Sequence, residues 1–386
     1  MDIKTLDKTY IANTYARADV VFIEGKGARL VDNHGKEYID LGGGIAVNTF
    51  GVADELWTEA VYAQAKRLQH ISNLYFTEPQ AELAQMLCVK TGASKIFFSN
   101  SGAEANECMI KTARKYASDR QRSSNIIALK NSFHGRTIAT LSATGQEKYH
   151  KNFGPFLNGF YFASANDFDD IERLANKISP CAIMMELVQG EGGICPLNYE
   201  YVKKVEAFAK ANDILLMIDE VQTGNGRTGS LYAFQHYGIS PDIVSTAKGL
   251  AGGLPIGATM MFEKTKDVLV AGDHGSTFGG NPVSAAAAIS VLLRIDDKLL
   301  NEVKLKSAYI FEALRGANGV KDVSGLGLML GILPDTVPAT DIVKACLERG
   351  VVLLTAKNKI RLLPPLNIEM KELEKAITIL KEELSK

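Results

Sequence analysis

Short apolar runs alternate with longer amphipathic segments through the middle of the chain. The runs lack polar alternation, which is typical of parallel strands covered on both faces. Amphipathic stretches between them, such as 103–116 and 199–211, predict helices. This alternation predicts an α/β domain with a mostly parallel sheet, in which a strand near 260–261 lies at an edge with its direction left open. The apolar runs occupy residues 96–98, 126–129, 182–186, 214–218, 243–245 and 256–262.

The two ends of the chain have a different pattern. Residues 20–45 hold β-branched pieces broken by glycines, which predict a small meander. Beyond about residue 300, helical and strand-like patterns are mixed, which predicts a separate α+β lobe. The helical patterns there cover 302–314, 341–348 and 371–384, and the strand-like ones cover 327–333 and 351–363.

Composition excludes several classes of protein. The 386 residues carry 43 Lys and Arg against 44 Asp and Glu, a net charge of −1 without a basic stripe, which argues against a nucleic-acid binder. No apolar stretch approaches the ~18 residues of a membrane span, and the first residues lack the apolar core of a secretory signal. The five cysteines and six histidines show no metal-binding spacing, so we expect no metal and a reducing, cytoplasmic setting.

A predicted strand, a tight turn and a helix follow one another at Ser99–Ala105. Gly102 lets the backbone approach a ligand closely, and the first amides of a helix lack intrahelical partners. A phosphate would fit there. Taken alone, the segment is more typical of a serine that caps a helix.

Two charged residues follow predicted strands directly. Asp219 comes after 214–218 and Lys248 after 243–245. Ligands of open α/β sheets bind beyond the carboxyl ends of strands. A lysine among small and apolar residues loses its proton easily and forms imines. Each residue alone is also compatible with an ordinary loop acid or a solvated lysine.

Further candidates change the picture when they are taken together. Phe133 supplies an aromatic platform, while Arg136 and Arg361 supply two guanidinium groups. With an imine-forming lysine, an acid for a ring nitrogen and an anion cradle, these are the parts of a pyridoxal-phosphate (PLP) enzyme that acts on a carboxylated amine.

The sequence resembles the class III aminotransferases of fold type I, and within that family the acetylornithine type. The resemblance covers nearly the whole chain, from Thr14-Tyr15-Ala16-Arg17 onward. It implies a large PLP-binding domain with a mostly parallel sheet over residues 51–298 and a small α+β domain built from 1–50 and 299–386. The motifs that carry it, in family order, are FSNSGAEANE, FHGRT, QGEGG, IDEVQTGNGRTG, AKGLAGGLPIGA, HGSTFGGNP and IRLLPPL.

The resemblance implies a cofactor role for each matching residue. Lys248 would form the Schiff base, and Asp219 would keep the pyridine nitrogen protonated. Phe133 and Val221 would clamp the ring, and Gln222 would reach the ring oxygen. Ser101, Gly102 and Ala103 would hold the phosphate, with Thr277 contributed by the second chain of a homodimer.

Substrate roles are implied in the same way. Arg136 would grip a substrate carboxylate, and Tyr15 and Ser276 would lie at the substrate. Glu191 would neutralise Arg361 while an amine-tailed substrate is bound, and release it for the second carboxylate of glutamate or 2-oxoglutarate. The implied reaction moves the terminal amino group of N-acetylornithine to 2-oxoglutarate, in arginine biosynthesis.

Several positions depart from the family pattern. Leu187 stands where relatives place proline after a glutamate, and Asn225 where they place an apolar residue. Gly44 stands where ornithine-specific relatives carry a bulky aromatic residue, which leaves room for an N-acyl group. The alternatives left open are ornithine, succinylornithine, succinyl-diaminopimelate or 4-aminobutyrate as donor, and a glutamate-1-semialdehyde aminomutase. A protein that binds the cofactor without catalysis is a further alternative.

Overall fold

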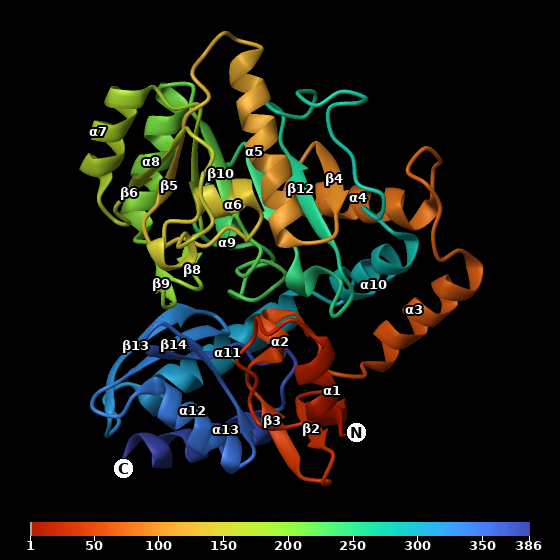
Figure 1. Cartoon of the computed structure of the whole chain (residues 1–386), viewed down its shortest axis with the longest axis vertical. Coiled ribbons are helices and arrows are strands. Elements are labelled where there is room, and N and C mark those ends of the chain that lie inside the picture. The colour runs from red at the N-terminus through yellow and green to blue at the C-terminus, as the bar shows by residue number, and fades with distance from the viewer. Residues whose placement is uncertain (1) are drawn as a thin grey trace.

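A seven-stranded sheet forms the centre of the larger lobe in the computed structural model, which describes residues 2–386 (Figure 1). Every neighbouring pair is parallel except those that include β12, which runs antiparallel to both β4 and β11. In spatial order the strands are β4 (Lys95–Ser99), β12 (Gly257–Met261), β11 (Ile243–Thr246), β10 (Leu215–Asp219), β7 (Ala182–Met185), β5 (Ile126–Leu129) and β6 (Phe160–Ala163).

Both faces of this sheet are buried, which explains why its strands read as continuous apolar runs. On one face, Met184 and Met217 pack with Met109 of α5. On the other face, Ile183 and Leu216 join a larger core. The helices of this lobe that follow strands in the chain are α5 (Gly102–Ser118), α6 (Ile138–Ala143), α7 (Phe168–Ile178), α8 (Tyr199–Ala211) and α9 (Ala233–His236).

The strand expected at an edge near 260–261 lies inside the sheet instead. β12 is hydrogen-bonded on both sides, and all five of its residues are buried. Its antiparallel direction follows from the short connection after β11, which contains the 3-10 turn η2 (Lys248–Leu250). Such a connection is too short for the helical crossover that a parallel neighbour needs.

Three helices extend the larger lobe to one side (Figure 1). They are α3 (Glu55–Arg67), α4 (Glu78–Thr91) and α10 (Pro282–Leu292), and α10 packs on the other two. α4 has a proline in its first turn and ends at Gly92, whose left-handed φ of 79° suits a residue without a Cβ.

The smaller lobe combines both ends of the chain, which lie in the red and blue parts of Figure 1. β15 from the C-terminal part pairs in parallel with β3 of the N-terminal meander. The first sheet has the order β1 (Phe22–Lys26), β2 (Arg29–Asp32), β3 (Glu37–Asp40) and β15 (Val351–Val352). The second has the order β13 (Val320–Leu326), β14 (Met329–Pro334), β17 (Lys359–Leu362) and β16 (Leu354–Ala356).

The helices of the smaller lobe match the three helical patterns read from the sequence. They are α11 (Asp297–Leu314), α12 (Ala339–Glu348) and α13 (Met370–Leu384). The remaining elements are α1 (Ile3–Tyr10), α2 (Gly43–Ala46), η1 (Glu147–Tyr149), β8 (Val188–Gln189) and β9 (Cys195–Pro196). Among residues 2–386, no helix is both long enough and apolar enough to cross a membrane.

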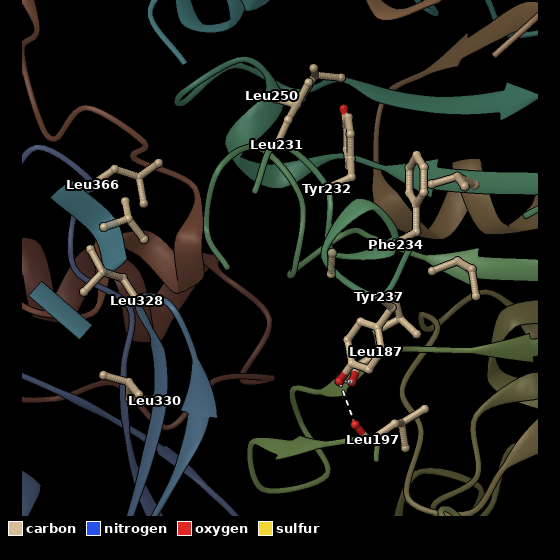
Figure 2. Close-up of a cluster of buried hydrophobic side chains, with 14 of the residues drawn as sticks. Leu187, Leu197, Leu231, Tyr232, Phe234, Tyr237, Leu250, Leu328, Leu330 and Leu366 are labelled. Carbon is tan, nitrogen blue, oxygen red and sulfur yellow. Dashed lines mark hydrogen bonds between the residues drawn. The ribbon is translucent and has the colours of Figure 1, made fainter. Parts of the chain in front are cut away.

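The cores of the two lobes approach each other behind the carboxyl ends of the central strands. Figure 2 shows Leu187, Leu197 and Tyr237 of the larger lobe on one side and Leu328, Leu330 and Leu366 of the smaller lobe on the other. The Tyr237 hydroxyl donates to the carbonyl of Leu197 at 2.7 Å. The loops after β7 and β10 therefore stand on a packed, hydrogen-bonded base.

Candidate active site

A cavity of about 460 Å³ opens at the carboxyl ends of β4, β5, β7, β10 and β11. Its size is that of a pocket for a small organic ligand. It lies where open α/β sheets bind their ligands. The residues that line it are Val47, Asn100, Ser101, Gly102, Ala103, Asn106, Phe133, His134, Gly135, Arg136, Glu186, Asp219, Val221, Gln222, Ala247, Lys248 and Gly253–Ile256.

The N-terminus of α5 forms one wall of the cavity. The Ser101 hydroxyl accepts from the backbone N–H of Glu104 at 3.2 Å, as a helix cap does. Gly102 lies so close to Val221 that an added Cβ would stand 2.6 Å from Val221 Cγ1. The unpaired amides of the first turn, together with the helix dipole, make this wall suited to a phosphate.

Asp219 ends β10 and is held by three donors. Its Oδ2 receives Nδ1 of His134 and Nδ2 of Asn106, each at 2.7 Å, and its Oδ1 receives the backbone N–H of Val221 at 3.0 Å. The side chains of Asp219, His134 and Asn106 are all buried. The carboxylate is therefore fixed in orientation before any ligand arrives, as a partner for a cationic ring nitrogen must be.

Lys248 follows β11 and takes a left-handed backbone conformation, with φ at 45°. Strain of this kind at a non-glycine residue is often found at functional sites. Burial lowers the pKa of the Lys248 amine, while Glu191 acts in the opposite direction. An amine that loses its proton more easily is a better imine-forming nucleophile.

The turn that carries Lys248 is anchored on both sides. Thr49 donates its hydroxyl to the carbonyl of Gly249 at 2.8 Å, and Nδ2 of Asn225 donates to the carbonyl of Ala247 at 3.1 Å. Asn225 is one of the departures from the family pattern, and the structure gives it this buried anchoring contact.

Phe133, Val221 and Gln222 come from two loops and all line the cavity. The Phe133 ring contacts the ring of Tyr149 edge-on, with 5.4 Å between the centroids. Gln222 is buried beside Gly190, where an added Cβ would lie 2.5 Å from the amide nitrogen of Gln222. Gly190 therefore allows the loop before Glu191 to pack against Gln222.

Arg361 and Glu191 form a charge pair next to these residues. Nη1 of Arg361 lies 2.5 Å from Oε1 of Glu191 and 3.4 Å from Oε1 of Gln222. Arg361 is 4% exposed, and its Nε has no hydrogen-bond partner within residues 2–386. A buried guanidinium with one unpaired N–H can donate a hydrogen bond to a carboxylate of a ligand.

Of the other candidates, Arg136 lines the cavity, while Ser276, Thr277 and Tyr15 are absent from its wall. Arg136 is exposed, with its guanidinium 4.8 Å from the centre of the Tyr149 ring. The Ser276 hydroxyl accepts from Nδ2 of Asn100 at 3.2 Å, which places it at the rim. Thr277 is exposed. Tyr15 is 69% exposed in the N-terminal segment, and the structure does not bring it to the cavity wall of this chain.

Sequence reasoning gave no role to three polar residues of the wall, namely Asn106, His134 and Glu186. In the structure, Nδ1 of His134 is hydrogen-bonded to Asp219. A usable signal was present for His134 and Glu186, because each closely follows a buried strand. Asn106 lies one helical turn after Gly102, on the side of α5 that faces the sheet.

Comparisons with known proteins agree with this geometry. Residues 10–384 match the model of the family described as aminotransferase class III. An acetylornithine aminotransferase of Haemophilus ducreyi is 50% identical over 99% of this chain and 98% of its own length. One from Caldanaerobacter subterraneus is 46% identical over 99% and 98%.

Solved structures are similar over the same extent. The ornithine aminotransferase of Toxoplasma gondii, crystallised with PLP in partial occupancy at the active site, superposes with a TM-score of 0.94 at 31% identity, over 99% of this chain and 93% of that one. The N-acetylornithine aminotransferase of Stenotrophomonas maltophilia superposes with a TM-score of 0.86 at 32% identity, over 99% and 98%.

The cavity is compatible with PLP in charge and size. The N-terminus of α5 would suit the phosphate, Asp219 a protonated ring nitrogen and Lys248 the aldehyde carbon. His134 Nε2 and Asn106 Oδ1 are buried side-chain atoms without hydrogen-bond partners in residues 2–386, so the network around Asp219 has bonding capacity left for a ligand or water. No group of three or more His, Cys, Asp or Glu side chains in the same residues is arranged for a metal ion.

Proposed function

Because the chain belongs to the class III aminotransferase family and is thus a PLP-dependent transaminase, we propose that its amino donor is N-acetylornithine. The terminal amino group passes to 2-oxoglutarate, giving N-acetylglutamate semialdehyde and glutamate, a step of arginine biosynthesis. Whole-chain relatives named acetylornithine aminotransferase at 41–50% identity support this donor. The observation that carries the proposal is Lys248 and Asp219 lining one cavity beside the Arg361–Glu191 pair.

PLP supplies an electron sink for the carbon that loses its proton. Asp219 keeps a proton on the ring nitrogen, and His134 and Asn106 fix the carboxylate that does so. Lys248, whose pKa is lowered by burial, would be the residue that holds the cofactor covalently, and its amine would carry a proton as a general base and acid. Phe133 and Val221 would hold the ring, and Gln222 would reach its oxygen, since all three line the cavity.

The substrates are sorted by charge. Arg136 binds the carboxylate that both substrates share. While N-acetylornithine is bound, Glu191 neutralises Arg361, and when 2-oxoglutarate is bound Arg361 pairs with its second carboxylate instead. Gly44 leaves room for the acetyl group, and its neighbour Val47 lines the cavity. Ser276 would contribute to the substrate site from the rim, where its hydroxyl contacts Asn100. Tyr15 stays a proposed substrate contact on the family resemblance alone.

The phosphate site belongs to a homodimer in this proposal. Ser101, Gly102 and Ala103 hold the phosphate from one chain, and Thr277 holds it from the other. Support comes from a large apolar surface around Thr277, in which Leu74, Tyr75, Phe76 and Phe278 are all more than half exposed. Asn73 joins the two segments by donating to the carbonyls of Ser276 and Gly279 at 2.9 Å. Apolar patches of this kind mark protein interfaces.

A hybrid dimer tests the shared site. Lys248→Ala chains and Thr277→Ala chains are each expected to form weakly active or inactive dimers. Mixing them creates one site that has Lys248 from one chain and Thr277 from the other, so activity should return. If Thr277 acts within its own chain, mixing restores nothing.

The donor is tested by a single-turnover scan of amines, followed through the absorbance of the bound cofactor. N-acetylornithine should react with the highest kcat/KM, ahead of ornithine, succinylornithine, succinyl-diaminopimelate and 4-aminobutyrate. Recovery of the starting spectrum should require 2-oxoglutarate, which separates a transaminase from an aminomutase. A higher kcat/KM for ornithine would overturn the proposed donor.

A cytoplasmic setting is part of the proposal and is supported by five cysteines that form no disulfide.

A further inference from the structure

A buried carboxylate in the cavity wall has no role in the scheme above. Glu186 directly follows β7, lines the cavity and is 5% exposed. Its Oε1 accepts from the backbone N–H of Phe133 at 2.8 Å, and its Oε2 accepts from the backbone N–H of Gly190 at 3.0 Å. Both oxygens are therefore used to hold backbone rather than another side chain.

The two N–H groups belong to loops with different tasks. One loop carries Phe133, which faces the cofactor ring, and His134, which fixes Asp219. The other loop carries Gly190 and then Glu191, which pairs with Arg361. A single carboxylate thus sets the distance between the loop at the ring and the loop that controls the charge of Arg361.

The backbone beneath Glu186 is rigid. Leu187 is fully buried, and its carbonyl accepts the backbone N–H of Leu197 at 2.9 Å. Figure 2 shows Leu187, Leu197 and Tyr237 packed together at this point. Leu187, which replaces the family's proline, is therefore part of the base on which the carboxylate stands.

The charge of Glu186 also reaches the cofactor site. Burial raises the pKa of the Glu186 carboxyl to about 7, His134 opposes that rise and Asp219 adds to it. In turn, Glu186 is among the groups that raise the pKa of Lys248. Removing its negative charge therefore makes a protonated nitrogen on Lys248 less stable.

We propose that Glu186 is a positioning residue of this transaminase, which fixes the ring-side loop and the Glu191 loop relative to each other through its two backbone bonds. The proposal rests on the proposed function for its substrate effects. It does not rest on it for its effects on the bound cofactor, which need no amine.

Glu186→Gln is the first test, performed on the PLP-loaded enzyme. Glutamine has one acceptor oxygen, and its NH₂ group cannot accept, so one of the two backbone N–H groups loses its partner. We expect the KM for N-acetylornithine to rise about tenfold, because Glu191 is no longer held in place to neutralise Arg361. The KM for 2-oxoglutarate, which does not need that pair, should change less than about threefold. The absorbance midpoint of the Lys248-bound cofactor should move to lower pH, because a negative charge near Lys248 is lost.

Glu186→Asp separates geometry from charge. It keeps the carboxylate but is one methylene shorter, so it cannot reach both loops. The absorbance midpoint should stay within about 0.2 pH units of the native enzyme, and the KM for N-acetylornithine should still rise at least about threefold. This variant decides the question if Glu186→Gln does not fold.

Asp242→Asn is the matched control. Asp242 is also a partly enclosed carboxylate that accepts a backbone N–H, that of Leu216 at 2.8 Å, but it lies before β11, at the opposite end of that strand from Lys248. Its substitution should lower the unfolding midpoint without moving the absorbance midpoint or the ratio of the two KM values.

Unchanged KM values in both Glu186 variants would overturn the proposal, as would equal shifts in the control. If N-acetylornithine is not a substrate, the affinity for PLP decides instead, because the loop that carries Phe133 and His134 loses its anchor in both Glu186 variants. An unchanged PLP affinity in both variants overturns the proposal.

Discussion

Substitution of Gly102 by alanine tests whether the phosphate wall and the ring clamp are one packed unit. The added Cβ would stand 2.6 Å from Cγ1 and 2.8 Å from Cγ2 of Val221, so one of the two residues must move. Gly102 has no left-handed φ and lies in the first turn of α5, where alanine is well tolerated, so within the protein the penalty comes from the collision with Val221.

Overpacking of this kind costs about 1–3 kcal/mol. The clash pushes Val221 away from the place where it faces the ring, so that cost falls on the PLP-bound state. At 1.4 kcal/mol per decade, the affinity for PLP should fall by up to about 5- to 150-fold. The assay is a titration of the cofactor-free protein with PLP, followed by absorbance, with the unfolding midpoint measured in parallel.

Val221→Ala supplies the decisive comparison. It removes both methyl groups that the new Cβ meets, so the double variant Gly102→Ala/Val221→Ala should bind PLP more tightly than the product of the two single losses, by at least about 1 kcal/mol of coupling. Additive losses would refute the reasoning, because they would mean that Gly102 and Val221 do not meet.

Three further predictions concern other parts of the chain. Gly44→Tyr should lower kcat/KM for N-acetylornithine more than for ornithine, with Gly44→Ala as the control for the strain that its φ of 63° imposes, and equal losses for both amines would remove the argument. Arg136→Ala deletes a charged hydrogen-bond partner worth about 1.5–3 kcal/mol, so kcat/KM should fall about 10- to 150-fold, and a loss below that would point to another carboxylate clamp. Burial raises the pKa of the Glu220 carboxyl from its usual 4.5 to about 7, so the folded state binds this proton more tightly than the unfolded state. The free energy of unfolding therefore falls as pH rises from about 5 through 7. Glu220→Gln should remove about 3 kcal/mol of that fall, measured by urea unfolding of the cofactor-free protein at pH 5 and pH 8.

Elements whose signal is local were predictable from the sequence. The strand at 126–129 and the helix at 199–211 have the same bounds in the structure as in the hydrophobic pattern. The parallel sheet followed from apolar runs that are buried on both faces. α10 gave no such signal because it is apolar on nearly all sides and so has no polar stripe.

The interior place of β12 could not be predicted from its own residues. Its five buried positions read the same in a central or a covered edge strand, and only its pairing with β4, more than 150 residues earlier in the chain, settles the question. Strand order of this kind is a property of the whole topology rather than of any segment.

In the candidate site, too, single residues were predictable from local signals, whereas the contacts between distant residues were not. Asp219 and Lys248 were visible because each follows a buried strand, and strand ends meet at one edge of a parallel sheet. The bond from His134 to Asp219 joins residues 85 positions apart, and that between Arg361 and Glu191 joins residues 170 apart. The resemblance to a family proposed the second pair. For the first, the strand ends indicate that both residues lie at the same edge of the sheet, but not that their side chains are bonded.

The most direct measurement is to locate the covalent bond between the protein and PLP. Borohydride reduction of the loaded enzyme, followed by digestion and mass spectrometry, should place the cofactor's mass on Lys248 alone, and Lys248→Ala should carry none and lose turnover almost completely. Label on a different lysine, or full turnover by Lys248→Ala, would contradict the account.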